Sequence, residues 1–306
     1  MQVNRRAFLA GGAAAAAGLT MLPQSRAVDI PLPAQEAVLK LSSQLGVIPG
    51  GSLEEKLDKM QGWGFDGVEV GGDVIGNEQK YLDAIANTDM QYNAICWGSC
   101  NGDLVSDDAE RRKRGVDKLK QALESAGKIK STGVIYVPAF IPETNRTNQE
   151  IRQLLVETFP AIGEFAVSVG SRVLFEPLNR NEAFFLRQLA DAASICRDIN
   201  SPGVQMMGDF YHMYIEETSD LGAFLSAGSY LHHVHLASRI RVLPGQDERS
   251  FVDGFRGLKL IGYQDYCSFE CGCKEGTDRH EEIPKSLEFL REQWAGAGLM
   301  EFEFAE

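Results

Sequence analysis

The chain is short of basic residues. Its 306 residues include 30 lysines and arginines against 43 aspartates and glutamates, a formal net charge of −13. That balance argues against nucleic acid as the main partner and leaves small neutral substrates open. The sequence also lacks a cluster of arginines, lysines or backbone amides that would bind a phosphate group, so an unphosphorylated substrate is favoured.

Other missing features limit the fold. No G-x-G-x-x-G opens a helix after a predicted strand, which argues against a dinucleotide-binding domain. No long linker divides the chain beyond its first residues, so we expect one domain. The six cysteines lie mostly within predicted strands or helices, as small buried apolar residues do. A disulfide between Cys96 and Cys100 stays open, and Cys271 and Cys273 lack zinc-ribbon spacing.

The first residues have the pattern of an export signal. Arg5 and Arg6 precede an alanine-rich apolar run that is too short to span a membrane, and small residues precede a possible cleavage point after Ala27. The arginine pair resembles a twin-arginine signal, although an ordinary secretory signal or an anchor would also fit. We predict a signal peptide over residues 1–27 and a linker over 28–37. The protein is then expected to use the twin-arginine export machinery, to reach the bacterial periplasm and to keep no stable membrane anchor.

Beyond the linker, strand patterns and helix patterns alternate. The strand patterns are short apolar runs, and the helix patterns repeat apolar residues every three or four positions. Eight such pairs in about 270 residues predict an α/β fold, a single TIM (β/α)8 barrel over residues 38–306. Strands are expected over residues 38–44, 67–70, 92–97, 133–140, 171–175, 203–209, 231–237 and 266–270. Helices are expected to start near residue 52 and over 77–86, 106–130, 149–169, 181–199, 218–229, 250–262 and 283–294.

Four polar residues each end one of the last four predicted strands. They are Glu176, Asp209, His235 and Glu270, separated by 33, 26 and 35 residues. Because the C-terminal ends of parallel barrel strands meet at one face, these side chains are expected to converge. A single glutamate at a strand end is most often part of a salt bridge, but three carboxylates and an imidazole together suit one divalent metal ion. Manganese is the first expectation, with magnesium, cobalt or zinc as alternatives.

The motifs around these residues resemble a known family. The sequence reads E-P-L-N-R-x-E from Glu176, D-x-x-H from Asp209, H-x-x-x-x-x-R-x-x-P-G from His235, and S-F-E ending at Glu270. The set, in this order, resembles the sugar isomerases and epimerases with a xylose-isomerase-like TIM barrel. The ketose 3-epimerases that act on tagatose and psicose are the nearest pattern. The resemblance covers roughly residues 38–295.

The resemblance implies a role for each ligand candidate. Glu176, Asp209, His235 and Glu270 would hold the metal. Glu176 and Glu270 would also be the catalytic acid and base, on opposite faces of the sugar, and would titrate as a coupled pair. Proton removal beside the ketone would give an enediolate, which a metal stabilises.

Substrate contacts are expected from five further residues. By the same resemblance, His212 and Arg241 would hold the oxygen at C2 and its neighbour, and Glu182 would pair with one of them. Glu69 and Trp97 end the second and third predicted strands, where they could meet the sugar. The loops over residues 98–107 and 271–278 match no pattern, so the exact sugar is not predicted.

The expected function is therefore a metal-dependent isomerase or epimerase of a small carbohydrate, either as a monomer or as a homo-oligomer. One alternative keeps the site and makes the enzyme a lyase that acts on 3-keto-glycosides. A DNA-repair endonuclease of the same barrel type is disfavoured, because it would need a three-metal cluster and the chain has only five histidines and a negative charge. A non-enzymatic sugar-binding barrel is also disfavoured, because binding alone does not require two bases.

Overall fold

Eight parallel strands close into a barrel in the computed structural model, which describes residues 35–298. Each strand pairs with the next in the sequence, and β8 pairs with β1. The single eight-stranded barrel predicted from the sequence is confirmed. The strands are β1 Lys40–Gln44, β2 Gly67–Gly71, β3 Gln91–Gly98, β4 Gly133–Tyr136, β5 Val173–Phe175, β6 Val204–Asp209, β7 Leu231–Leu236 and β8 Tyr266–Phe269.

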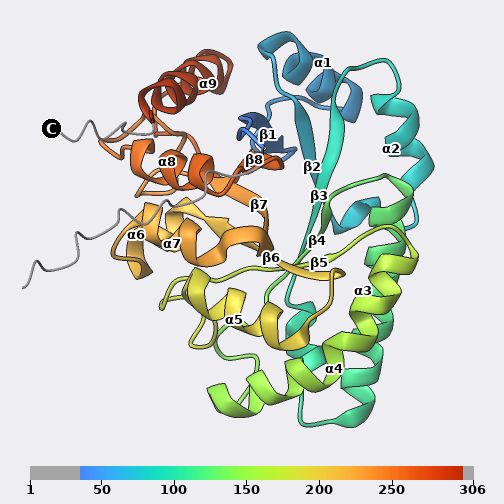
Figure 1. The fold of residues 1–306 in the computed structure, drawn as a ribbon. Helices are drawn as coiled ribbons and strands as arrows, with labels where there is room; N and C mark the ends of the chain where they lie inside the picture. Colours follow the sequence, from blue (N-terminus) through green and yellow to red (C-terminus); the bar gives the residue numbers. More distant parts are fainter. Residues whose placement is uncertain (1–34, 299–306) are drawn as a thin grey trace, which may run out of the picture. The chain divides into compact units, whose positions relative to one another are not determined.

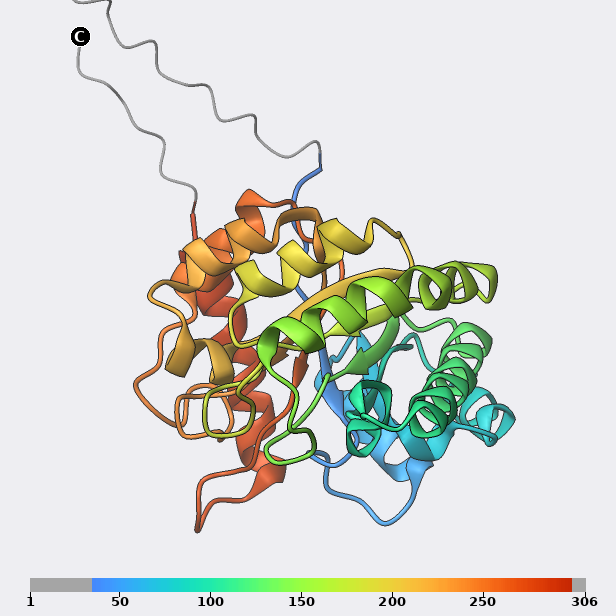
Figure 2. The same ribbon diagram turned by 90° about the horizontal axis from the view of Figure 1, so that it is seen from below.

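The helices surround the strands in chain order. In Figure 1 they follow one another clockwise, from α1 at the top to α9 at the upper left, and Figure 2 shows α4, α5 and α7 side by side across the outside of the barrel. They are α1 Leu53–Trp63, α2 Glu78–Ile85, α3 Ala109–Lys128, α4 Asn148–Ser168, α5 Leu189–Ile199, α6 Phe210–Glu216, α7 Asp220–Ala227, α8 Val252–Leu260 and α9 Arg279–Gly296. Among the described residues, the 3-10 helices are η2 Gly72–Val74, η3 Cys100–Val105 and η4 Gly228–Tyr230. None of the helices within residues 35–298 is long and apolar enough to cross a membrane.

Local capping explains where several helices begin. Ser52 accepts a hydrogen bond from the backbone of Glu55 at the start of α1. At the start of α4, Thr147 and Glu150 form a reciprocal capping box. Each cap satisfies backbone N–H groups that have no partner inside the helix, so these starts follow from the local sequence.

Several segments differ from the sequence expectation. The strand expected over 133–140 ends at Tyr136, shortly before Pro138, which has no N–H group for a strand ladder. The helix expected over 181–199 begins only at Leu189, because Ala183, Phe185 and Leu186 are buried as a loop that is closed by a hydrogen bond from the Leu178 backbone N–H to the Leu186 carbonyl. A short helix, α6, which the sequence did not predict, follows β6 directly.

The described cysteines are all free, so the disulfide left open between Cys96 and Cys100 is not formed. The predicted signal peptide, residues 1–27, and all but the last three residues of the predicted linker lie outside the described residues.

A separate apolar layer lies among strands β3 to β6. Ala94, Ile135, Leu174 and Met207 form this cluster, one residue from each strand, and Cys96 packs against it. All four are fully buried. On β6 this layer lies between Gln205, near the start of the strand, and Asp209, the predicted site residue at its end.

Candidate active site and metal centre

The four predicted metal ligands lie at the ends of neighbouring strands. Glu176 follows β5, Asp209 ends β6, His235 is the next-to-last residue of β7, and Glu270 follows β8. His235 Nδ1 lies 3.3 Å from Glu270 Oε2, 3.6 Å from Glu176 Oε1 and 3.7 Å from Asp209 Oδ2. One ligand atom from each residue lies within 4.8 Å of all the others. The structure thus brings together all four side chains that the sequence singled out.

Two of these atoms have unfilled hydrogen-bonding capacity. Among the described residues, neither Asp209 Oδ2 nor His235 Nδ1 has a hydrogen-bond partner, although both residues are fully buried. Buried polar atoms in native proteins nearly always have partners, so these two are exceptions that need an explanation. A divalent cation would satisfy both, and one imidazole with three carboxylates is a donor set that such ions accept. The residues present therefore fit a metal ion.

Burial and neighbouring charges set the protonation of this cluster. Burial lowers the pKa of His235, but Glu69 and Glu270 outweigh burial and leave that pKa well above its ordinary value. Burial raises the pKa of Asp209, yet His212, His235 and Arg241 hold it well below the usual range. These shifts favour an ionised carboxylate beside a protonated imidazole in the metal-free protein, and a bound cation would replace the proton on Nδ1.

Glu176 behaves differently from Asp209. Burial and the nearby charge of Glu270 raise the pKa of Glu176, against the opposing effect of His235. Because a raised pKa favours the protonated carboxyl, Glu176 is suited to holding a proton. The site therefore places a carboxyl that can carry a proton beside carboxylates that can bind a cation.

His212 presents an N–H group to the same site. The backbone N–H of Asn179 donates to His212 Nδ1 at 3.2 Å, and Asn179 Nδ2 lies 2.8 Å from the same atom. An Nδ1 that accepts from a backbone N–H cannot carry a proton, so the proton of the neutral ring is on Nε2. Within residues 35–298, Nε2 has no hydrogen-bond partner, and it lies 3.6 Å from Asp209 Oδ2. His212 can therefore donate a hydrogen bond to a bound molecule.

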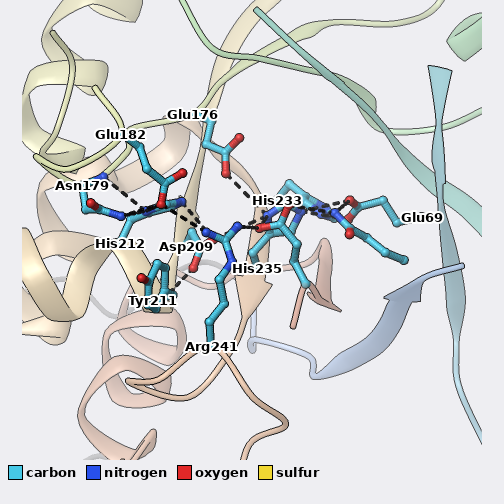
Figure 3. Close-up of polar contacts among 12 residues, drawn as sticks. Glu69, Glu176, Asn179, Glu182, Asp209, Tyr211, His212, His233, His235 and Arg241 are labelled. Carbon is cyan, nitrogen blue, oxygen red and sulfur yellow. Dashed lines mark hydrogen bonds and ion pairs between the residues drawn. The ribbon is translucent and has the colours of Figure 1, made fainter. Parts of the chain in front are cut away.

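Arg241 joins the two sides of the site. Its Nη2 donates to Glu270 Oε2 at 2.7 Å, and its Nη1 lies 3.3 Å from Glu182 Oε1. The guanidinium also lies over the ring of Tyr211, 4.8 Å from its centroid. Glu182 in turn accepts from Asn179 Nδ2 at 2.8 Å. Figure 3 shows these contacts as one continuous network from Asn179 to Glu69.

Glu69 lies against Nε2 of His235, whereas Glu176, Asp209 and Glu270 lie near Nδ1 of the same ring. Glu69 is fully buried, His233 Nε2 lies 2.8 Å from its Oε2, and His235 Nε2 lies 3.0 Å from both of its oxygens. Gln44 Nε2 also donates to Glu69 Oε1 at 2.8 Å. Burial raises the pKa of Glu69, but the two histidines outweigh burial and leave the pKa well below normal. Contact of Glu69 with substrate, and likewise contact of the partly buried Trp97, stays a prediction.

Sequence reasoning missed Gln44 and Asn179. Gln44 ends β1, and the strand-end argument that identified Glu176 could have found it. Asn179 acts partly through its backbone N–H, which no side-chain pattern reveals. Both residues orient groups that the sequence did identify.

Comparison with known proteins connects this geometry to an enzyme family. The model of the xylose isomerase-like TIM barrel family matches residues 57–293. The 3-dehydro-D-guloside 4-epimerase of Escherichia coli is 29% identical over 265 residues, which cover 83% of this chain and 99% of that enzyme. A probable ketose 3-epimerase of Synechocystis sp. is 23% identical over 232 residues, covering 72% of this chain and 78% of the relative.

Solved structures share the barrel. The crystal structure of the E. coli 3-keto-D-glucoside 4-epimerase superposes with a TM-score of 0.73 at 26% identity, covering 83% of this chain and 100% of that one. A D-psicose 3-epimerase from Clostridium cellulolyticum H10, solved with D-tagatose, gives a TM-score of 0.77 at 20% identity and covers 84% of this chain and 99% of that one. At that lower identity the second likeness shows the fold alone.

Proposed function

The chain belongs to the xylose isomerase-like TIM barrel family, and we propose that it is a divalent-metal-dependent epimerase of carbonyl sugars that moves a proton between Glu176 and Glu270. Its relatives are named epimerases, and the chain is accordingly an enzyme of the isomerase class. One observation carries the finer proposal. Two carboxyl groups that could transfer a proton share a buried site with two unpartnered ligand atoms, Asp209 Oδ2 and His235 Nδ1.

The chemistry requires these groups because a C–H bond beside a ketone is only weakly acidic. When bound, a divalent cation would polarise the ketone and stabilise the negative charge of the enediolate. In one direction, Glu270 accepts the proton from carbon and Glu176 returns a proton to the opposite face. The raised pKa of Glu176 suits it to be the donor. In the other direction the two glutamates exchange these roles.

Donors around the carboxyl groups would orient the sugar. His212 offers its Nε2–H, and Arg241 offers a fixed positive charge on the same side of the site. Donors that are already positioned where an oxygen becomes negative stabilise the transition state without reorganisation. The 2.7 Å contact between Arg241 and Glu270 also places that charge next to one of the two catalytic groups.

Solvent exchange tests this proposal. Ketoses and 3-keto-glycosides are incubated with the enzyme in D₂O, and deuterium at the carbon beside the ketone is measured by NMR. We expect exchange with at least one sugar, its loss on metal removal, its return with added manganese, and a fall of about 10²–10⁴-fold in Glu270→Gln. Glu275→Gln, an exposed glutamate in the loop after β8, is the matched control and should be unaffected. Exchange that survives complete metal removal would contradict the proposal.

Elimination is a second candidate outcome. The likeness to the E. coli enzyme supports the substrate class that elimination would need, because that enzyme's name specifies a 3-dehydro sugar, although the reaction it names is epimerisation at C4. A ketone at C3 acidifies the hydrogens at both C4 and C2. Removal of the C4 hydrogen and reprotonation gives an epimer. Removal of the C2 hydrogen, formation of a C1–C2 double bond and cleavage of the C1–O bond would instead release the group at C1 as an alcohol, which takes up the proton.

Product analysis separates the two outcomes. A 3-keto-glycoside with a chromophoric group at C1 is incubated with the enzyme, and the released alcohol is measured alongside the C4 epimer. Epimer without release supports the epimerase. Stoichiometric release without epimer would make the enzyme a lyase.

We also propose that the protein is exported. The support is the sequence of residues 1–27, with its paired arginines and apolar run. Fractionation of bacteria that produce the full chain should place the processed protein in the periplasm, and Arg5→Lys with Arg6→Lys should retain it in the cytoplasm. Unchanged export of the double variant would rule out the twin-arginine route.

A further inference from the structure

We propose that Glu69 is a positioning residue, which holds the proton of His235 on Nε2 and so keeps the Nδ1 lone pair facing the cluster formed by Glu176, Asp209 and Glu270. This inference rests on the proposed metal centre, in which Glu69 would fix the orientation of the ligand His235. Glu69 would then act through His235, in place of the substrate contact expected from the sequence.

The hydrogen-bond geometry carries this assignment. Both oxygens of Glu69 lie 3.0 Å from His235 Nε2. An ionised carboxylate has no proton to donate, so the imidazole must be the donor in this pair. The other ring nitrogen, Nδ1, is then the one available to a cation, and it is the nitrogen that lies 3.3–3.7 Å from three carboxylates. Metal-binding histidines commonly donate their second N–H to a carboxylate in this way.

Gln44 holds Glu69 and Glu270 together. Its side-chain amide donates to Glu69 Oε1 at 2.8 Å and to Glu270 Oε1 at 3.0 Å. Gln44 is also paired with Glu69 in the register of β1 and β2, so the barrel sheet itself fixes their relative positions. One partly buried amide thus connects the support of His235 to a second proposed ligand.

The same atoms suggest a competing interpretation. Glu69, His233 and His235 also lie close enough to hold an ion of their own, with their ligand atoms within 4.8 Å. Each oxygen of Glu69, however, already lies at hydrogen-bond distance from a histidine N–H donor, and Gln44 directs a further donor at Oε1. A cation there would have to displace all of these hydrogens. We therefore expect one ion per chain, bound on the Nδ1 side of His235.

Metal titration tests the role of Glu69 without an activity assay. The metal-stripped full chain is titrated with Mn²⁺ by calorimetry, as the parent protein and as Glu69→Leu and Glu69→Gln. Loss of the acceptor in Glu69→Leu should weaken Mn²⁺ binding about 10–100-fold. Glu69→Gln keeps one acceptor oxygen and should restore part of that affinity. The parent should bind one ion.

Asp265→Asn is the matched control. Asp265 pairs with His232 Nδ1 at 2.7 Å; His232 lies on β7 as His235 does, but this carboxylate–histidine pair is partly exposed. Its loss should leave Mn²⁺ affinity unchanged. A folded Glu69→Leu protein with the parent affinity would overturn the proposal, and so would a parent that binds two ions with one lost in Glu69→Leu.

A spectroscopic measurement covers the case in which Glu69→Leu does not fold. Nitrogen-15 NMR of the zinc-loaded parent protein distinguishes the two histidine tautomers. We expect His235 to carry its proton on Nε2 and its metal on Nδ1. The opposite tautomer would overturn the proposal without any variant, while leaving the proposed epimerase activity to be judged by solvent exchange.

Discussion

His212 and His235 are both buried beside Asp209, yet the structure prepares them for opposite tasks. Behind His212, the backbone N–H of Asn179 donates to Nδ1, and Nε2–H faces the site. Behind His235, Glu69 accepts from Nε2, and Nδ1 faces the site. The first histidine offers a donor and the second a lone pair. The partner on the far side of an imidazole thus decides whether the ring can bind a substrate oxygen or a cation.

Two buried carboxylates at the site, Glu69 and Asp209, differ in the same way. Glu69, on β2, is buried with both oxygens hydrogen-bonded. Asp209, on β6, is equally buried and keeps one oxygen without a partner among the described residues. Burial and charge alone do not distinguish a ligand from its support. Between these two carboxylates, the oxygen of Asp209 without a partner marks the proposed ligand, and the hydrogen-bonded oxygens of Glu69 mark the support.

Replacing each histidine by leucine should give the largest contrast. His235→Leu removes a direct ligand, so Mn²⁺ affinity should fall by more than the about 10–100-fold that loss of an outer partner costs. His212→Leu removes an N–H donor, so kcat should fall about 10²–10³-fold while Mn²⁺ affinity stays unchanged. Calorimetry and steady-state kinetics measure the two effects, with thermal melts to confirm folding. Equal loss of metal affinity in both variants would remove the distinction between them.

Arg241→Lys should have an intermediate effect. Lysine keeps the charge but cannot reach Glu182 and Glu270 with the planar pair of donors that arginine offers. Loss of one hydrogen bond to a charged group predicts a fall in kcat/KM of about 10–100-fold. Arg239→Lys is the control, because Arg239 lies on the same loop and pairs with Glu248, which is exposed. A parent-like kcat/KM for Arg241→Lys would exclude Arg241 from substrate orientation.

The pH dependence of stability should be the smallest effect. A raised pKa means that folding favours protonated His235, so its contribution is complete below the unfolded pKa of about 6.5 and is lost as pH rises through the folded pKa. The metal-free protein should therefore lose thermal stability as pH rises above about 6.5. Calorimetric melts of the parent protein and of His235→Leu measure thermal stability at each pH. The melting temperature of the variant should not show the fall above about pH 6.5. His212→Leu should retain it.

The sequence predicts the ligand residues of this site but not the residue that supports them. Alternating patterns predicted eight strands, and the strand-end rule placed Glu176, Asp209, His235 and Glu270 together, because barrel geometry forces such ends to meet. The support of His235 was not predictable, because it depends on which hydrogen bonds Glu69 has already made. Residues 181–188 looked helical from their apolar spacing, but tertiary burial of Phe185 and Leu186 overrides local preference there.

We propose that a cation binds on the Nδ1 side of His235 and that Glu69 supports the ring from the other side. Anomalous diffraction from crystals of the full chain soaked with Mn²⁺ tests it most directly. We predict one peak per chain, bounded by Glu176, Asp209 Oδ2, His235 Nδ1 and Glu270. A peak between Glu69, His233 and His235 Nε2, with none at the other position, would contradict the account.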